Sequence, residues 1–134
     1  MSKILLETKD LKKNYDHFDG QVTLFKNLNI RIKEGELVAL VGPSGSGKSS
    51  LLHILALLDE PSGGKVIVDS QETKNFSDNQ KEEMRKKTIS IIFQDNNLLS
   101  DFTAIENIKM PLIIKGEKEW IIKEKAEQIL KEVK

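Results

Sequence analysis

The sequence predicts a mixed α/β fold, with a small antiparallel sheet near its N-terminus and a buried parallel sheet after it. Three observations lead to this prediction. Short β-type runs occupy residues 4–32, two nearly all-apolar runs of strand length lie at 36–41 and 89–93, and helical patterns stand between and after them. Apolar strands without alternation are typical of parallel sheets that helices cover on both faces.

Composition narrows the possible classes of protein. The chain of 134 residues has 21 basic and 21 acidic side chains, so its formal net charge is zero. A general nucleic-acid binder carries a basic excess, so we expect no nucleic-acid partner. The chain has no cysteine, which excludes a disulfide framework, a thiolate zinc site and a cysteine nucleophile. Its apolar runs are far shorter than the about 18 residues of a membrane span.

The first element should be an antiparallel sheet. Its predicted strands are residues 4–7, 21–25 and 28–32. Asp19 and Gly20 form a turn signal between the first two strands.

The next elements indicate a buried core. Residues 36–41 are predicted to form a strand that is buried on both faces, and a glycine-rich turn follows. Residues 48–58 are apolar on almost every side, which predicts a central helix. A turn from Asp59 to Gly64 ends this helix, and a short strand over 65–69 follows.

The second half of the chain should be mainly helical. Asp78 can cap a charged helix over 79–87, which precedes the second buried-type strand at 89–93. Thr103 and Glu106 have the spacing of a capping box.

The last two helices follow from the same kind of pattern. Pro111 should kink or end the helix that the capping box starts. Ile122, Ala126 and Ile129 recur at helical spacing among Lys and Glu residues, which predicts an amphipathic helix. We expect Trp120 to pack at the start of this helix, and the alternative is that it contacts a partner.

The motif that carries chemistry is G-P-S-G-S-G-K-S, which matches the P-loop pattern G-x-x-x-x-G-K-[ST]. Glycines permit backbone conformations that side chains forbid, so that successive N–H groups can surround a phosphate. The helix that follows adds the positive end of its dipole. The predicted nucleotide-binding residues are Gly42, Pro43, Ser44, Gly45, Ser46, Gly47, Lys48, Ser49 and Ser50.

Three side chains of this motif have distinct predicted roles. Lys48 supplies a charge for the β- and γ-phosphates, the Ser49 hydroxyl ligates Mg²⁺, and Ser50 donates to a phosphate oxygen. The alternative is a glycine-rich surface loop with an exposed lysine. A buried strand before the loop and a buried helix after it favour phosphate binding.

With this motif in place, the sequence resembles the ATP-binding subunits of ABC transporters over essentially the whole chain. Tyr15 and Gln94 carry the resemblance beyond the P-loop. It implies a P-loop NTPase core of RecA-like type that binds ATP and Mg²⁺. It also implies that Tyr15 stacks on adenine and that Gln94 reaches the Mg²⁺ and the attacking water. Lys48 and Gln94 are then the candidate catalytic residues, and Ser49 and Gln94 the candidate magnesium ligands.

Two longer stretches, SSLLHILALLDEPSGG at 49–64 and QDNNLLSDFTAIENIKMPL at 94–112, are similar to the lipoprotein-releasing subfamily and its macrolide-exporter kin. This likeness implies an ATPase that energises the release of lipoproteins from the inner membrane. It implies separate membrane permease subunits, a homodimer of nucleotide-binding subunits, and a peripheral position on the cytoplasmic side of that membrane.

The family pattern continues with a Leu-Ser-Gly-Gly signature, an apolar strand that ends in Asp-Glu, and a switch His, and none of these follows here. We therefore expect the N-terminal portion of one nucleotide-binding domain. Its predicted parts are a β subdomain at 1–35, a P-loop core at 36–94 and the start of a helical subdomain at 95–134. We expect this chain alone to be deficient in hydrolysis, because it lacks a positioned base.

Several alternatives stay open. In one alternative, the subunit serves a macrolide- or peptide-type exporter or an importer. In another, the chain is a non-hydrolysing nucleotide-binding fragment. A small-molecule kinase is disfavoured, because Tyr15 and Gln94 would then be coincidences. Leu98, Leu99 and Phe102 form either part of a core or a groove for a helix of the membrane subunit.

Overall fold

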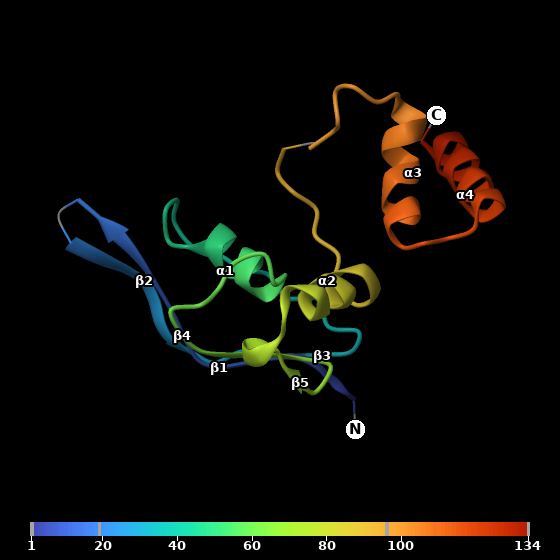
Figure 1. Cartoon of the computed structure of the whole chain (residues 1–134). Helices are drawn as coiled ribbons and strands as arrows, with labels where there is room; N and C mark the ends of the chain where they lie inside the picture. The colour runs from blue at the N-terminus through green and yellow to red at the C-terminus, as the bar shows by residue number, and fades with distance from the viewer. Residues whose placement is uncertain (1, 19, 96, 134) are drawn as a thin grey trace. The chain divides into compact units, whose positions relative to one another are not determined.

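Figure 1 shows the computed structural model of the chain, which describes residues 2–18, 20–95 and 97–133. The chain divides into two compact units, Met1–Arg85 and Lys86–Lys134. Asp19, part of the predicted turn, lies outside the described residues. None of the described helices is both long and apolar enough to traverse a bilayer.

The first unit is built on a five-stranded antiparallel sheet with the order β2-β1-β4-β5, in which β3 also pairs with β1. Its strands are β1 (Ile4–His17), β2 (Gly20–Leu28), β3 (Arg31–Lys33), β4 (Gly63–Val68) and β5 (Gln71–Glu72). This confirms the predicted antiparallel sheet. Strand β1 is much longer than predicted, because pairing with β2 holds its polar second half extended.

The two predicted all-apolar strands are wrong for this structure. Residues 36–41 and 89–93 have irregular backbone, and the side chains of Leu37 and Ile92 are 101% and 98% exposed. A strand of this kind is stable only when neighbours pair with its edges and cover its faces. Among the described residues, no strand pairs with either segment.

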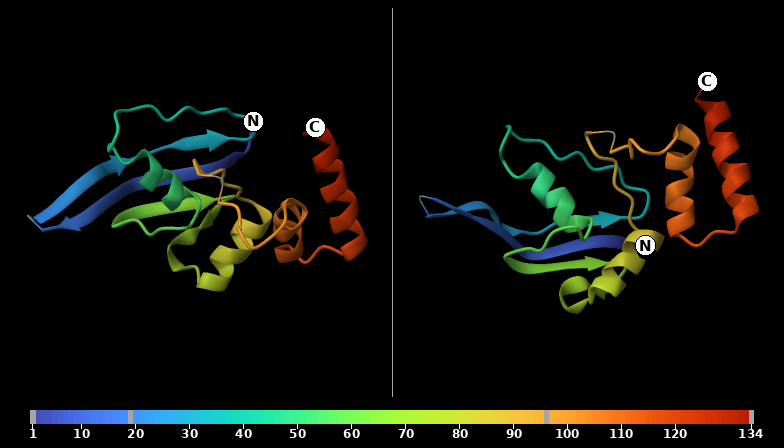
Figure 2. Two further views of the ribbon diagram at one scale, coloured as in Figure 1. Left: turned by 90° about the horizontal axis from the view of Figure 1, so that it is seen from above. Right: turned by 45° about the horizontal axis from the view of Figure 1, so that its top comes forward.

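The helix after the glycine-rich loop is shorter and less buried than predicted. Helix α1 (Lys48–Leu55) lies over one face of the sheet (Figures 1 and 2). Leu51 and Ile54 are buried, whereas Leu52 is half exposed. One face of α1 therefore joins the core of the unit. A helix is buried all round only where elements cover every side, and residues 36–41 form no such strand.

The charged helix α2 (Asp78–Lys87) forms as predicted, after the short 3₁₀ helix η1 (Thr73–Asn75), but its cap differs. The Gln80 N–H donates to Ser77 Oγ (3.3 Å), and the Ser77 N–H donates to Gln80 Oε1 (2.8 Å). Ser77 therefore caps the helix through a capping box. Asp78 lies in the first turn, where the helix dipole favours its negative charge.

The second unit contains the helices α3 (Ala104–Ile114) and α4 (Glu119–Glu132), which pack against each other. Ile122 and Ala126 are buried, as the amphipathic pattern of α4 predicts. Trp120 is 65% exposed, so its predicted packing is wrong. The first turn of α4 places its side chain on the solvent side.

The capping box at the start of α3 is confirmed. The Thr103 N–H (2.8 Å) and hydroxyl (2.6 Å) both donate to the Glu106 carboxylate, and the Glu106 N–H donates back to Thr103 Oγ1 (3.4 Å). These hydrogen bonds from Thr103 hold the pKa of Glu106 below its ordinary value. A carboxyl group with a lowered pKa stabilises the fold above its unfolded pKa, and this stabilisation is lost as the pH falls through the folded pKa.

Thr103→Ala should therefore weaken α3 and reduce its sensitivity to acid. Removal of an N-cap threonine costs about 1 kcal/mol of helix stability. Thermal melts followed by circular dichroism at neutral pH and below pH 4 measure both effects. Ser100→Ala, which removes an exposed hydroxyl from the preceding loop, is the control. Equal acid sensitivity in Thr103→Ala and the wild type would contradict this role of Glu106.

Candidate functional site

The predicted phosphate-binding loop joins residues 36–41 to α1. Gly45 and Gly47 have φ angles of 79° and 88°, in the left-handed region that favours glycine. Gly47 is the N-cap of α1, and its carbonyl accepts the N–H of Leu51 (2.8 Å). No described side chain caps this helix. The N–H groups of its first turn are therefore left for another acceptor.

Two glycines of the loop also have little room for a side chain. A Cβ at Gly42 would lie 3.0 Å from Ser46 Oγ, and one at Gly47 would lie 3.2 Å from the Cβ of Leu24 in β2. The loop thus folds tightly on itself and against the sheet. A loop with this backbone presents its amides closely to an anion.

Lys48 folds back over the loop. Its ammonium donates to the carbonyl oxygens of Gly42 (2.8 Å) and Pro43 (2.6 Å). Both acceptors are neutral, so these contacts leave the positive charge uncompensated. The loop therefore has the helix N-terminus, the glycine amides and a cation on one short segment. This arrangement fits a phosphate chain, and the exposed Ser49 hydroxyl on the first turn of α1 fits a ligand of Mg²⁺.

The structure brings Tyr15 beside this segment. Its hydroxyl lies 3.5 Å from the Oγ of Ser50 in α1 and 3.4 Å from the Oδ2 of Asp59. The Tyr15 side chain is 45% exposed. Thus the aromatic side chain predicted from the resemblance stands next to a predicted phosphate ligand.

The other predicted residues lie in the second unit. Gln94 is exposed and follows the irregular segment 89–93. Leu98 is 68% exposed, and Leu99 and Phe102 are about half exposed, so the interpretation of these three as core is wrong. The role of Gln94 stays a prediction.

Sequence reasoning missed Lys13 and Asp59. Lys13 is 7% exposed and forms an ion pair of 2.6 Å with Asp59. Burial raises the pKa of the Asp59 carboxyl, but hydrogen bonds from Lys13 and the Glu60 N–H outweigh it and hold this pKa below its ordinary value. The signal was the alternation along β1, which puts Lys13 on the same face as Leu11 and Tyr15.

A family model described as "ABC transporter" matches residues 25–134. The chain belongs to the ABC transporter family. This confirms the resemblance that the sequence shows, down to the level of the ATP-binding domain.

The curated relatives of this ABC protein include "Lipoprotein-releasing system ATP-binding protein LolD" from two bacteria. The Idiomarina loihiensis protein is 39% identical over 130 residues, which is 97% of this chain and 57% of that protein. The Acinetobacter baylyi protein is 39% identical over 134 residues, which is 99% of this chain and 59% of that protein. The chain thus spans somewhat more than half the length of these relatives.

Solved ABC cassettes share the fold. The ATP-binding cassette MJ0796, in a dimeric post-hydrolysis state bound to ADP and Pi, matches with a TM-score of 0.87 and 36% identity over 95% of this chain and 56% of that chain. CbiO1 from Clostridium perfringens, part of the ABC transporter complex cbiONQ, matches with a TM-score of 0.75 and 28% identity, over 96% of this chain and 50% of that chain. The predicted α/β class is therefore confirmed.

Proposed function

We propose that this ABC chain binds the phosphates of MgATP through residues 42–50, as part of the ATP-binding subunit of a transporter. The observation that carries the proposal is the position of Lys48, whose uncompensated ammonium lies over a glycine loop at the uncapped N-terminus of α1. Anions are favoured at such a helix end.

Each residue then has one task. The amides of Gly45 and Gly47 and the ammonium of Lys48 hold phosphate oxygens. Ser49 would ligate Mg²⁺, which supplies charge neutralisation to the phosphate chain when it is bound. Tyr15 offers a ring to the adenine, and its place beside Ser50 supports this role. Gln94 would orient the attacking water and reach the same ion.

The transporter that we propose is a lipoprotein-releasing system. The two LolD relatives support this choice, since they match nearly the whole of this chain. The subunit would then act as a homodimer with integral membrane permease subunits, at the cytoplasmic face of the inner membrane. The dimeric MJ0796 cassette supports the homodimer. The second candidate is a macrolide- or peptide-type exporter or an importer, and the identity of the permease that co-purifies with the chain distinguishes these.

We also propose that the 134 residues by themselves bind ATP without appreciable turnover. None of the strands in the described part of the chain is an apolar strand that ends in Asp-Glu, and loss of a positioned general base lowers the rate by roughly 10²- to 10⁴-fold. Release of phosphate by the purified chain at a rate typical of an ATPase would contradict this proposal.

Calorimetric titration of the whole chain with nucleotides tests the phosphate site. We expect MgATP to bind at least about tenfold more tightly than AMP, because one lost charge-assisted hydrogen bond is worth roughly a factor of ten or more. Omission of Mg²⁺ should weaken the binding of ATP. Equal affinities for ATP and AMP, or no binding of either, would refute the assignment of residues 42–50.

A further inference from the structure

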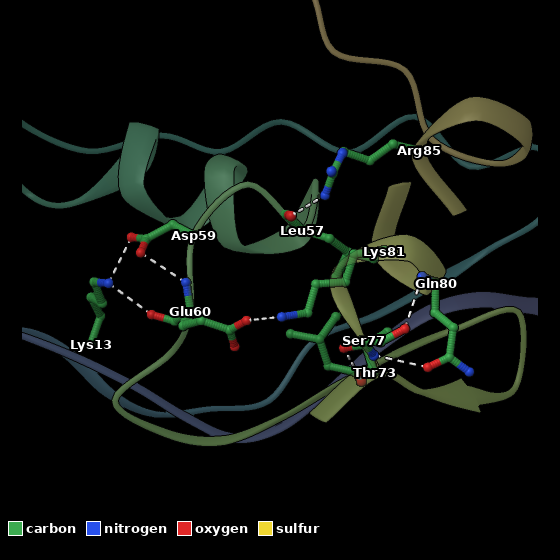
Figure 3. A network of polar contacts seen from close by, with 10 residues as sticks. Lys13, Leu57, Asp59, Glu60, Thr73, Ser77, Gln80, Lys81 and Arg85 are labelled. Carbon is green, nitrogen blue, oxygen red and sulfur yellow. Dashed lines mark hydrogen bonds and ion pairs between the residues drawn. The ribbon is translucent and has the colours of Figure 1, made fainter. Parts of the chain in front are cut away.

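Lys13 is a buried cation in the middle of β1. Its side chain is 9% exposed, and its ammonium contacts the Asp59 carboxylate at 2.6 Å and the Glu60 carbonyl oxygen at 2.7 Å (Figure 3). Removing an ammonium from water is costly unless acceptors replace the water. The two acceptors offset the cost of burying the Lys13 ammonium. A buried lysine does not improve solubility, so this position calls for another explanation.

The same pair holds Tyr15 at two points. The Lys13 ammonium lies 4.9 Å from the centroid of the Tyr15 ring, within the range of a cation–π contact. The carboxylate of Asp59 that pairs with Lys13 also accepts the Tyr15 hydroxyl, at 3.4 Å. One face and the polar tip of the ring thus have contacts, and the residue as a whole stays 45% exposed.

The segment that carries Asp59 is itself bound to β1. The Asn14 N–H donates to Ser62 Oγ (3.0 Å), and the Ser62 N–H donates to the carbonyl of Lys12 (2.8 Å). On its other side, the Glu60 carboxylate forms an ion pair with Lys81 of α2 (Figure 3). The carboxylate is therefore fixed relative to the strand that carries Tyr15.

We propose that Lys13 and Asp59 are positioning residues that hold the Tyr15 ring ready for the base of the nucleotide. The proposal rests on the proposed function. A side chain that is fixed before binding loses less entropy when the ligand stacks on it, which is worth roughly a factor of 2 to 10 in affinity. Among the described residues, the pair contacts Tyr15 and Glu60 and none of residues 42–49, so we expect it to act on the base half of the ligand.

The test compares two ligands, MgATP and inorganic tripolyphosphate with Mg²⁺, the second of which has no base. Lys13→Met keeps the apolar stem and removes the charge. It should weaken the binding of ATP roughly 2- to 10-fold and leave that of tripolyphosphate unchanged. Lys13→Arg keeps a cation for the ring and the carboxylate, and should recover much of the loss. Tyr15→Leu should remove the effect of Lys13→Met, because the two changes act on one contact.

Lys13→Met leaves the half-buried Asp59 carboxylate without its cation, which can destabilise the fold. The double variant Lys13→Met/Asp59→Asn removes both charges and is the control for this effect. Thermal melts establish that each variant is folded. Equal weakening of both ligands, or unchanged binding of ATP in a folded variant, would overturn the positioning role alone. A wild-type chain that binds neither ligand would overturn the proposed function, and this inference with it.

Discussion

Gly64→Ala is expected to destabilise the first unit by at least about 3 kcal/mol. Gly64 lies in β4 with a φ of 77°, and a Cβ there would lie 2.4 Å from the carbonyl oxygen of Asp10 and 2.5 Å from that of Lys9. Both atoms are backbone of β1, which pairs with three other strands. Because β1 cannot shift without disturbing those pairings, the clash cannot relax cheaply.

Gly35→Ala is the matched control for this effect. Gly35 has nearly the same φ, 78°, but a Cβ there would have no atom within 4 Å. Gly35→Ala should lower the free energy of unfolding by only about 1–2 kcal/mol, which is the cost of holding alanine in the left-handed conformation. Urea unfolding of the two variants measures the difference. A similar loss for both would mean that conformation alone, and not the approach of β4 to β1, requires glycine at position 64.

Features set by short stretches of sequence were predictable. The capping box of Thr103 and Glu106 depends on atoms three residues apart, and the phosphate loop depends on glycines and a lysine within eight residues. The N-terminal antiparallel sheet also follows from local β-type runs and a turn. In these cases the partners that satisfy the backbone lie within or near the pattern itself.

Features set by distant partners were not predictable in the same way. The apolar run 36–41 predicts a strand with neighbouring strands on both edges. Those strands would have to come from other parts of the chain, and the backbone of this run is irregular. The Lys13–Asp59 pair joins residues far apart in the sequence, and in a chain rich in lysine the sequence does not show that Lys13 is buried against a carboxylate. The alternation along β1 predicts which face of the strand carries Lys13. The acceptors of its ammonium are known only from the fold.

Lys48→Met is expected to weaken the binding of both MgATP and tripolyphosphate by about 10- to 100-fold, since charge-assisted hydrogen bonds are worth about 1.5–3 kcal/mol. The ammonium now donates to the carbonyls of Gly42 and Pro43, and the phosphate chain has to attract it away from these neutral acceptors. Weaker binding of tripolyphosphate distinguishes Lys48→Met from Lys13→Met, because Lys48 acts on the phosphates and Lys13 acts through the Tyr15 ring.

The thermal midpoint should change little, because Lys48 is only partly buried and its acceptors are exposed to water. Lys65→Met is the control, since it also removes a lysine charge, in β4, where the partner is Glu72. A surface ion pair of this kind contributes at most about 1 kcal/mol. If Lys65→Met weakened the binding of both ligands as much as Lys48→Met, the effect would come from the general charge of the chain. That result would contradict the assignment of phosphate binding to the loop.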